Sequence, residues 1–439
     1  MTGEWVSFAS GYFKESARDG TGCGRTVMNN ELQPHKRKLS RGPRAVSGRN
    51  RDFGRRFRLP ALTCVCLLVF YCHLGLYAQD AKLIDLSAEL EPVCKQAAMP
   101  ALGAAVICDG RLCAAGVVGV RKYGSDVKAE LGDPFHLGSC TKAMTGSLIG
   151  LLAQQGKLRW DMTLEEAFPE LKDTMHPDYR AVTLTHLLSH RAGLPQMTAG
   201  FELISREQLE EILAMPSPAA QRRCMAEIVL SRPPVRKPGE EMLYSNAGFA
   251  LAGAIAEKAA GEDYESLVKR MLFEPLGMNS AGFGAMGTSG RIDAPWQHTK
   301  AGDKITPIEP GPDSDNPPFL TPGGRVHCSI CDWAKYVQCV LKALRGEEGL
   351  LPAAEVRQLK EPPFGGDHAL GWTICERDWA HGRAFTHAGT NKQNYCIVWI
   401  APARNFAVLV ATNRGGEDAF GPLDKLCAQM IARFLKDAP

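Results

Sequence analysis

The chain has 439 residues, enough for two or three domains on length alone. Its apolar fraction of 45% and charged fraction of 23% are typical of globular proteins. The net charge of +3 conceals an asymmetry, because residues 1–78 hold 13 Lys and Arg against 5 Asp and Glu, so residues 79–439 carry −5. A mildly acidic globular part without a basic stripe argues against nucleic-acid binding.

The first 78 residues divide into two segments. Residues 1–58 are rich in Gly, Arg and Ser, which indicates a basic extension that is disordered or precedes the true start; Met28 is its only internal methionine. Residues 59–78 carry no charge and follow a basic stretch, as a secretory signal does. A single membrane anchor is the alternative. Pro60 and His73 interrupt the apolar run and favour cleavage, so we expect an exported protein, periplasmic or extracellular.

The globular part, residues 79–439, begins with a helical pattern over 82–98. "ALGAAVICDGRLCAAGVVGV" then predicts two antiparallel strands around the turn Asp109-Gly110. From Ser139 onward, apolar residues at 144, 148, 151 and 152 follow helical spacing, and Gly156 is placed to end that helix.

The middle of the chain is predicted to be helical. Residues 157–300 alternate helical runs with Pro and Gly breaks and show no strand ladder, which indicates a helical subdomain. Residues 301–324 predict a long Pro/Gly loop of the kind often found near a site. A helix is expected near 329–345.

Strand patterns return near the end of the chain, in "AFTHAG", "NYCIVWIAP" and "FAVLVATN", with a turn at 403–405 between the last two. A final amphipathic helix is predicted over 422–436. Strands at both ends and helices between them predict an α+β fold. We expect one antiparallel sheet formed from both chain ends and flanked by helices, with an inserted all-helical domain.

Cysteine usage predicts no metal and no cofactor. Eleven cysteines follow residue 78, an odd number that cannot pair completely. Most lie in apolar runs, as Cys108 and Cys396 do, where cysteine acts as a small buried side chain. Cys328 and Cys331 form a C-x-x-C without the second pair or nearby histidines that a zinc site needs.

The spacing S-x-x-K occurs three times, at Ser139/Lys142 and at residues 125/128 and 266/269. A serine hydroxyl needs a base and oxyanion donors to act as a nucleophile. Ser139 opens a predicted helix, so Lys142 shares its face one turn away, and a buried lysine there loses its proton by desolvation. The other two pairs lie in a polar turn and on a mid-helix surface. Ser139 is therefore the candidate nucleophile.

Two distant triplets carry further chemistry. Tyr244-Ser245-Asn246 precedes a predicted helix, and His387-Ala388-Gly389 ends a predicted strand. A phenol relays protons, an amide bonds on two sides, and a glycine permits close backbone approach. Each triplet alone also fits an ordinary polar loop.

Four stretches, in this order, resemble the serine β-lactamase and penicillin-binding protein superfamily, closest to class C β-lactamases and related esterases: residues 135–171, 182–195, 238–278 and 385–402. The resemblance runs from about 85 to 436. It implies the fold expected above, Ser139 as the acyl-forming nucleophile, Lys142 as its base partner and Tyr244 as the general base that also protonates the leaving group.

The resemblance also implies binding residues. Asn246 would contact the substrate and Lys142, and the backbone N–H groups of Ser139 and Thr390, beside Gly389, would form the oxyanion hole. Gln196 falls near a substrate-binding glutamine of class C enzymes, with the register off by one residue. The turn at residues 323–324 lines the site or is a plain loop-to-helix turn.

One departure concerns the substrate. Related enzymes carry Lys-Thr-Gly where this chain has His387-Ala388-Gly389. A histidine is mostly neutral at pH 7, which weakens the anchor for a substrate carboxylate. A near-match to Lys-Thr-Gly, Lys300-Ala301-Gly302, lies in a predicted polar loop. The departure shifts the expected substrates from penicillins towards esters or small amides.

The leading hypothesis is an exported, monomeric serine hydrolase that forms an acyl-enzyme. Its substrate would be an ester, small amide, D-alanyl peptide or β-lactam, thus a small-molecule or peptidoglycan-type substrate. The alternative is a catalytically silent penicillin-binding-like module that binds peptidoglycan or a protein partner. A metal hydrolase is disfavoured because His186 and His190, four residues apart, lack the glutamate expected after the first. Cys140 is expected to pack away from Lys142.

Overall fold

The computed structural model describes residues 83–198 and 200–435. The two segments predicted over residues 1–58 and 59–78 lie outside this part of the chain. Within it, no helix combines the length and the apolar character needed to cross a membrane.

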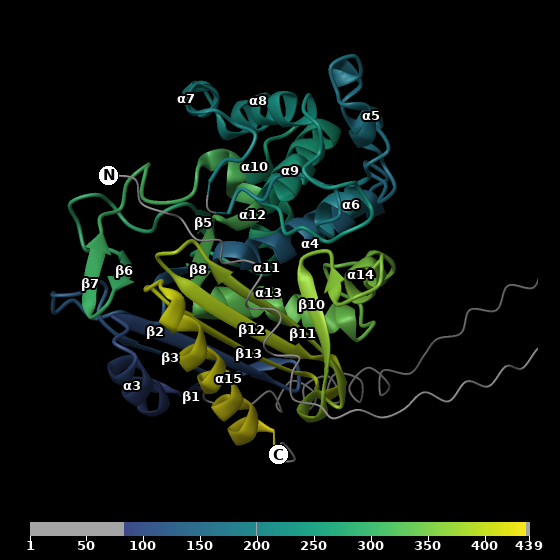
Figure 1. The fold of residues 1–439 in the computed structure, drawn as a ribbon. Helices are drawn as coiled ribbons and strands as arrows, with labels where there is room; N and C mark the ends of the chain where they lie inside the picture. Colours follow the sequence, from purple (N-terminus) through teal and green to yellow (C-terminus); the bar gives the residue numbers. More distant parts are fainter. Residues whose placement is uncertain (1–82, 199, 436–439) are drawn as a thin grey trace, which may run out of the picture. The chain divides into compact units, whose positions relative to one another are not determined.

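The main sheet has eight strands in the order β1-β3-β2-β13-β12-β11-β10-β9 (Figure 1). The strands are β1 (Ile84–Asp85), β2 (Ala101–Cys108), β3 (Arg111–Gly119), β9 (His368–Ala369), β10 (Trp372–Arg377), β11 (Gly382–Thr390), β12 (Tyr395–Ala401) and β13 (Phe406–Thr412). All neighbours are antiparallel except β1 and β3, and β2 pairs with β13, so strands from both ends of the described part of the chain share one sheet. The predicted α+β fold is confirmed.

The hairpin of β2 and β3 turns at Asp109-Gly110 as predicted. Both residues have positive φ, 50° and 73°, which is the backbone of the tight turn that fits the twist of paired strands. Gly110 adopts this backbone at no steric cost, and aspartate tolerates it better than most residues.

Helices cover both faces of the sheet. Along β13, Val408 and Val410 point to the face packed by α3 (Ser87–Gln96) and α15 (Phe420–Phe434), while Leu409 points to the other. Alternation with period two follows from the pleat of a strand. The second face is covered by α4 (Thr141–Gln154) and α13 (Ile330–Leu344), and the candidate nucleophile lies on this side.

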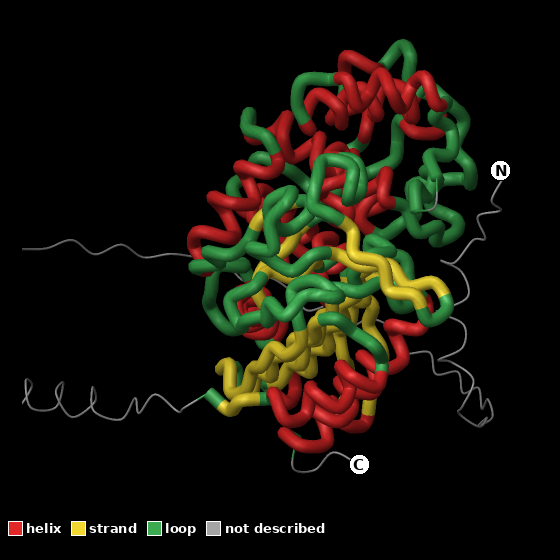
Figure 2. Tube along the Cα trace, turned by 90° about the vertical axis from the view of Figure 1, so that its left-hand side faces the viewer, coloured by secondary structure: helices red, strands yellow, loops and turns green. Residues whose placement is uncertain are grey.

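The predicted helical insertion is built from α5 (Leu164–Ala167), α6 (Leu184–Leu188), α7 (Arg206–Ala214), α8 (Pro218–Leu230), α9 (Asn246–Ala260), α10 (Tyr264–Val268), a π-helical turn (Lys269–Phe273) and α11 (Glu274–Leu276). Figure 2 shows these helices gathered on one side of the sheet. They pack on α4 mainly through α9, which begins at Asn246, the last residue of one of the two candidate triplets.

Several short elements differ from the prediction. Residues 297–308 form a hairpin, β6 (Gln297–Ala301) and β7 (Lys304–Ile308), where a loop was predicted from 301. A three-stranded sheet of β4 (Pro134–His136), β8 (Val326–Ser329) and β5 (Gly282–Phe283) also brings strand into the helical region. The prediction missed β9, β10 and α14 (Ala353–Lys360) as well. Strands of two to six residues span too few periods to stand out from loops.

The prediction that Cys108 acts only as a small buried side chain is wrong. It is joined to Cys113 across the β2–β3 hairpin by a disulfide, with a Cα–Cα distance of 5.7 Å that suits the bond. Cys396 is buried as expected, and the thiols of Cys328 and Cys331 are free. The hairpin brings Cys108 and Cys113 together, whereas the apolar pattern of the sequence indicated only that cysteines of this kind are buried.

Candidate active site

Ser139 lies in a single 3-10 turn, Gly138–Cys140, which leads directly into α4. Both its neighbours are buried, whereas Ser139 itself is partly exposed. Gly138 has φ 47°, and a Cβ there would lie 2.4 Å from the backbone nitrogen of Thr390. Only glycine fits this position, which therefore fixes the serine against the end of β11. The helix that follows is buried from residue 141 to 152, so it gives the serine a rigid support.

Lys142 is fully buried one turn after Ser139. Its Nζ lies 3.3 Å from Ser139 Oγ, 2.6 Å from Asn246 Oδ1 and 2.5 Å from the carbonyl oxygen of Gly323. Burial lowers the pKa of Lys142 to about 7. A neutral amine donates its two N–H groups to the amide and carbonyl oxygens, which leaves its lone pair facing the serine hydroxyl. The arrangement suits a base.

Tyr244 approaches the serine from the helical insertion. Its phenol donates a hydrogen bond of 2.7 Å to Ser139 Oγ. The next residue, Ser245, caps α9, since its Oγ accepts from Gly248 N–H at 3.1 Å and donates to Pro195 O at 2.6 Å. Burial raises the pKa of the Tyr244 hydroxyl above its ordinary value, so the resting phenol is a proton donor.

Asn246 is the first residue of α9. Its Oδ1 accepts from Lys142, and its Nδ2 donates to Met197 O at 2.8 Å. The backbone N–H of Asn246 donates to Gln196 O at 2.9 Å. The structure therefore brings Gln196 beside the site through its main chain, and Asn246 is held on both sides of its amide.

His387 lies on β11, on the sheet face that looks towards α4. Its Nδ1 is 2.7 Å from the carbonyl oxygen of Gly371. A carbonyl only accepts, so Nδ1 carries the proton. Burial lowers the pKa of His387 to about 3, and the neighbouring Lys142 acts in the same direction. The ring is therefore neutral throughout the physiological range, and the expected loss of a cationic anchor is stronger than the ordinary pKa of histidine suggests.

Gly389 and Thr390 place the end of β11 against the serine turn. A Cβ at Gly389 would lie 2.0 Å from Leu137 O and 3.0 Å from Cys140 N, both backbone atoms. The side chain of Thr390 is engaged in the following turn, where Oγ1 donates to Asn394 O at 2.6 Å. The backbones of Ser139 and Thr390 thus meet at one edge, as an oxyanion hole requires.

Three further groups lie near the serine: a carbonyl in the turn that the sequence offered as a lining of the site, and two histidines. The carbonyl of Gly323, in the turn named above, accepts from Lys142. The His190 ring lies 4.4 Å from that of Tyr244, and its Nδ1 accepts from Ser245 N–H at 3.0 Å. The His368 ring lies 5.0 Å from the His190 ring, tilted by 52°. The "SHRAGLP" segment held a signal for His190, whereas no sequence pattern pointed to His368.

The remaining candidates lie apart from this centre. Ser125 Oγ donates to Lys122 O, within a polar turn. His186 closes the cap of α6 through Thr183, and its ring packs on Phe364. Cys140 Sγ is buried and lies 3.5 Å from Sγ of Cys396 on β12, as expected of a packing residue. Within residues 83–198 and 200–435, no three His, Cys, Asp or Glu side chains are grouped as a metal ion would require.

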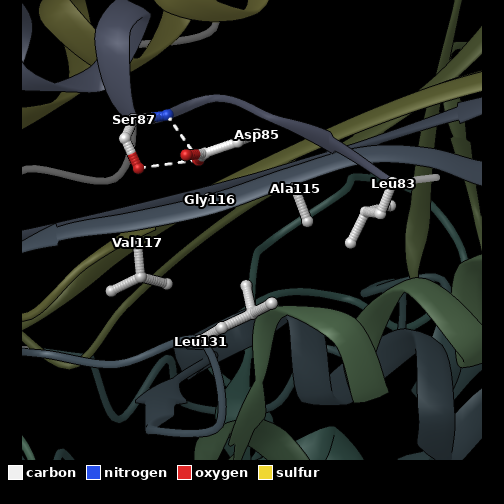
Figure 3. A pocket seen from close by; sticks show the side chains of 7 residues that line it. All are labelled: Leu83, Asp85, Ser87, Ala115, Gly116, Val117 and Leu131. Atoms are coloured by element: carbon white, nitrogen blue, oxygen red, sulfur yellow. Dashed lines mark hydrogen bonds between the residues drawn. The ribbon is translucent and has the colours of Figure 1, made fainter.

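A cavity of about 290 Å³ lies at the β1–β3 edge of the sheet, away from the serine (Figure 3). Its one carboxylate, Asp85, accepts from the backbone N–H and the hydroxyl of Ser87 at 2.9 and 2.7 Å. These polar groups satisfy each other, and the lining is otherwise apolar or backbone: Leu83, Ala115, Gly116, Val117 and Leu131. The cavity offers no reactive group.

Comparison with known proteins agrees with this geometry. The Beta-lactamase family model matches residues 85–427. The chain is 25% identical to penicillin-binding protein 4 of Amycolatopsis lactamdurans, over 73% of this chain and 83% of that protein. It is 23% identical to an unguisins hydrolase of Aspergillus violaceofuscus, over 77% of this chain and 58% of that one. Among solved structures, the octameric penicillin-binding protein homologue from Pyrococcus abyssi matches with a TM-score of 0.64 at 21% identity, covering 80% of this chain and 77% of that chain. The chain belongs to the β-lactamase family, and its similarity to these relatives supports its assignment as a serine hydrolase.

Proposed function

We propose that the protein hydrolyses an ester or small amide through a covalent acyl-enzyme on Ser139. One observation carries the proposal. The Ser139 hydroxyl stands between a phenol at 2.7 Å and a buried amine at 3.3 Å, in a turn that also presents its backbone N–H. A nucleophile with a proton acceptor on one side and a proton donor on the other is equipped for acyl transfer.

The proposed steps follow from the pKa values. Neutral Lys142 takes the Ser139 proton as Oγ attacks the acyl carbon, and the backbone N–H groups of Ser139 and Thr390 hold the developing oxyanion. Tyr244 then gives its proton to the leaving group as the bond to the acyl carbon breaks, and it regains a proton from Lys142. In deacylation the steps run in reverse with water in place of the leaving group. Tyr244, its proton passed to Lys142, accepts a proton from the attacking water, and Lys142 returns a proton to Ser139 Oγ as the acid is released.

The substrate preference rests on His387. Its neutral ring offers no positive charge to a substrate carboxylate, which supports neutral esters or small amides over β-lactams and D-alanyl peptides. Export and a monomeric state remain predictions. Peptide mapping of the mature N-terminus tests export, and light scattering tests the oligomeric state, for which the octameric relative is the contrasting precedent.

The direct test is turnover of a p-nitrophenyl ester by Ser139→Ala. We expect turnover to fall to the uncatalysed rate while the thermal unfolding transition persists. Ser125→Ala is the matched control, since it removes the serine of another S-x-x-K pair and leaves the site intact. Unchanged turnover in Ser139→Ala would refute the nucleophile. An inactive wild-type protein that binds peptidoglycan would instead identify a silent binding module.

A further inference from the structure

A buried polar chain runs behind the serine turn. The backbone N–H of Gly138 donates to His136 Nδ1 at 3.1 Å, and His136 Nε2 lies 2.9 Å from Asp315 Oδ2. Both side chains are fully buried. Because Nδ1 accepts from an N–H, the imidazole proton is on Nε2, which donates to the carboxylate. The residue preceding the nucleophile is thus bonded through a histidine to a buried acid.

The same carboxylate reaches the other side of the site. Asp315 Oδ1 accepts from Asn391 Nδ2 at 2.9 Å, and Asn391 directly follows Thr390. The Asn391 amide is itself fixed, because its Nδ2 also lies 2.7 Å from Gln297 Oε1. Asp315 therefore links Gly138, next to Ser139, with Asn391, next to Thr390.

The carboxylate is suited to this task because it stays ionised. Burial raises the pKa of Asp315, but the partial charge and hydrogen bond of His136, the charge of Arg325 and the Asn391 amide outweigh it and hold that pKa at about 2. Arg325 Nε donates to Oδ2 at 3.3 Å, so both oxygens are engaged. A buried carboxylate whose two oxygens both have hydrogen-bond partners is fixed in orientation. It therefore also fixes the orientation of His136 and Asn391.

We propose that His136, Asp315 and Asn391 are positioning residues that hold the two oxyanion-hole N–H groups in register. The two donors come from different elements, the 3-10 turn before α4 and the end of β11, so their spacing depends on a connection between these elements. Gly138 and Gly389 set how closely the elements approach, and the His136–Asp315–Asn391 chain sets their relative alignment. The inference rests on the proposed function, since it assigns a role within the same reaction.

Two substitutions of His136 test its two hydrogen bonds one at a time. His136→Asn keeps an acceptor for Gly138 N–H and loses the bond to Asp315, whereas His136→Gln keeps the bond to Asp315 and loses the acceptor. We expect each to lower kcat for a p-nitrophenyl ester by about 10- to 100-fold with KM changed less than about 2-fold, because loss of one oxyanion donor costs about 100- to 1000-fold and misalignment costs less. Asn391→Ala, in a loop, should act in the same direction.

A spectroscopic readout distinguishes positioning from general destabilisation. Oxyanion donors lower the stretching frequency of the acyl carbonyl, so infrared difference spectra of the acyl-enzyme, made with a ¹³C-carbonyl ester, should show a higher and broader band in the variants. His327→Asn is the control. His327 pairs with His136 across β4 and β8 but bonds Gly284 O through Nδ1, and asparagine keeps that bond. It should retain kcat and the band.

The outcomes separate this inference from the function on which it rests. Turnover by Ser139→Ala at the wild-type rate would overturn both the proposed function and the positioning role. An inactive Ser139→Ala together with wild-type kcat and carbonyl frequency per folded molecule in His136→Asn, His136→Gln and Asn391→Ala overturns the positioning role alone. Should the His136 variants not fold, Asn391→Ala decides the question by the same two measurements.

Discussion

Gly389→Ala perturbs the alignment of the site most directly. The added Cβ would lie 2.0 Å from Leu137 O, while ordinary contact begins at 3.4 Å, so the end of β11 and the serine turn must separate by about 1.4 Å. The two other close atoms are Cys140 N and Cys396 Sγ, each at 3.0 Å. The shortest contact is to a backbone oxygen, so no side-chain rotation relieves the overlap. The backbone N–H groups of Ser139 and Thr390, which we propose as the oxyanion donors, lie on the two segments that are forced apart.

A misplacement of about 1 Å costs about 100-fold in rate, so kcat for a p-nitrophenyl ester should fall by at least that factor. The overlap should also cost about 1–3 kcal/mol in the free energy of unfolding, measured by denaturant titration. Gly421→Ala, in α15, is the control, because a Cβ there has no neighbour within 4 Å. It should keep kcat and the fold. Wild-type kcat in folded Gly389→Ala would refute the close approach of the two donor segments.

Three further predictions concern proton transfer and specificity. kcat/KM for a neutral ester should rise with pH through about 7, because the pKa of Lys142 is lowered on folding and only its neutral form accepts the serine proton; a flat profile from pH 5 to 8 would exclude Lys142 as the base. Tyr244→Phe should lower turnover of an alkyl ester by about 100- to 10,000-fold and that of a p-nitrophenyl ester much less, because p-nitrophenolate leaves without a proton; equal losses would contradict a proton donor. His387→Lys should raise the kcat/KM ratio of carboxylate-bearing to neutral esters, and a fall in that ratio would contradict the electrostatic argument.

The fold was largely predictable because its long elements repeat a pattern. The continuous apolar run of β13 and the Asp109-Gly110 turn each carry their own signal. Short elements such as β9 do not, and the β6–β7 hairpin was concealed by the Pro and Gly residues that follow it. The Cys108–Cys113 bond depends on a hairpin register that apolar patterning does not specify.

The candidate residues could be singled out from the sequence, but their electrostatic environment could not. Resemblance implied Tyr244 as a general base, whereas its raised pKa favours the phenol as a resting donor and leaves Lys142 as the better base. Both shifts result from burial by segments distant in sequence. The same holds for His136 and Asp315, which lie 179 residues apart, so no local pattern connects them.

The central claim is that Ser139 forms the acyl-enzyme. Intact-mass and peptide-mapping spectrometry after treatment with a fluorophosphonate probe and, separately, with a penicillin tests it most directly. We predict one phosphonyl adduct per chain, located on Ser139 and absent from Ser139→Ala. Failure of both reagents to label the wild-type protein, or an adduct on another residue, would contradict the claim.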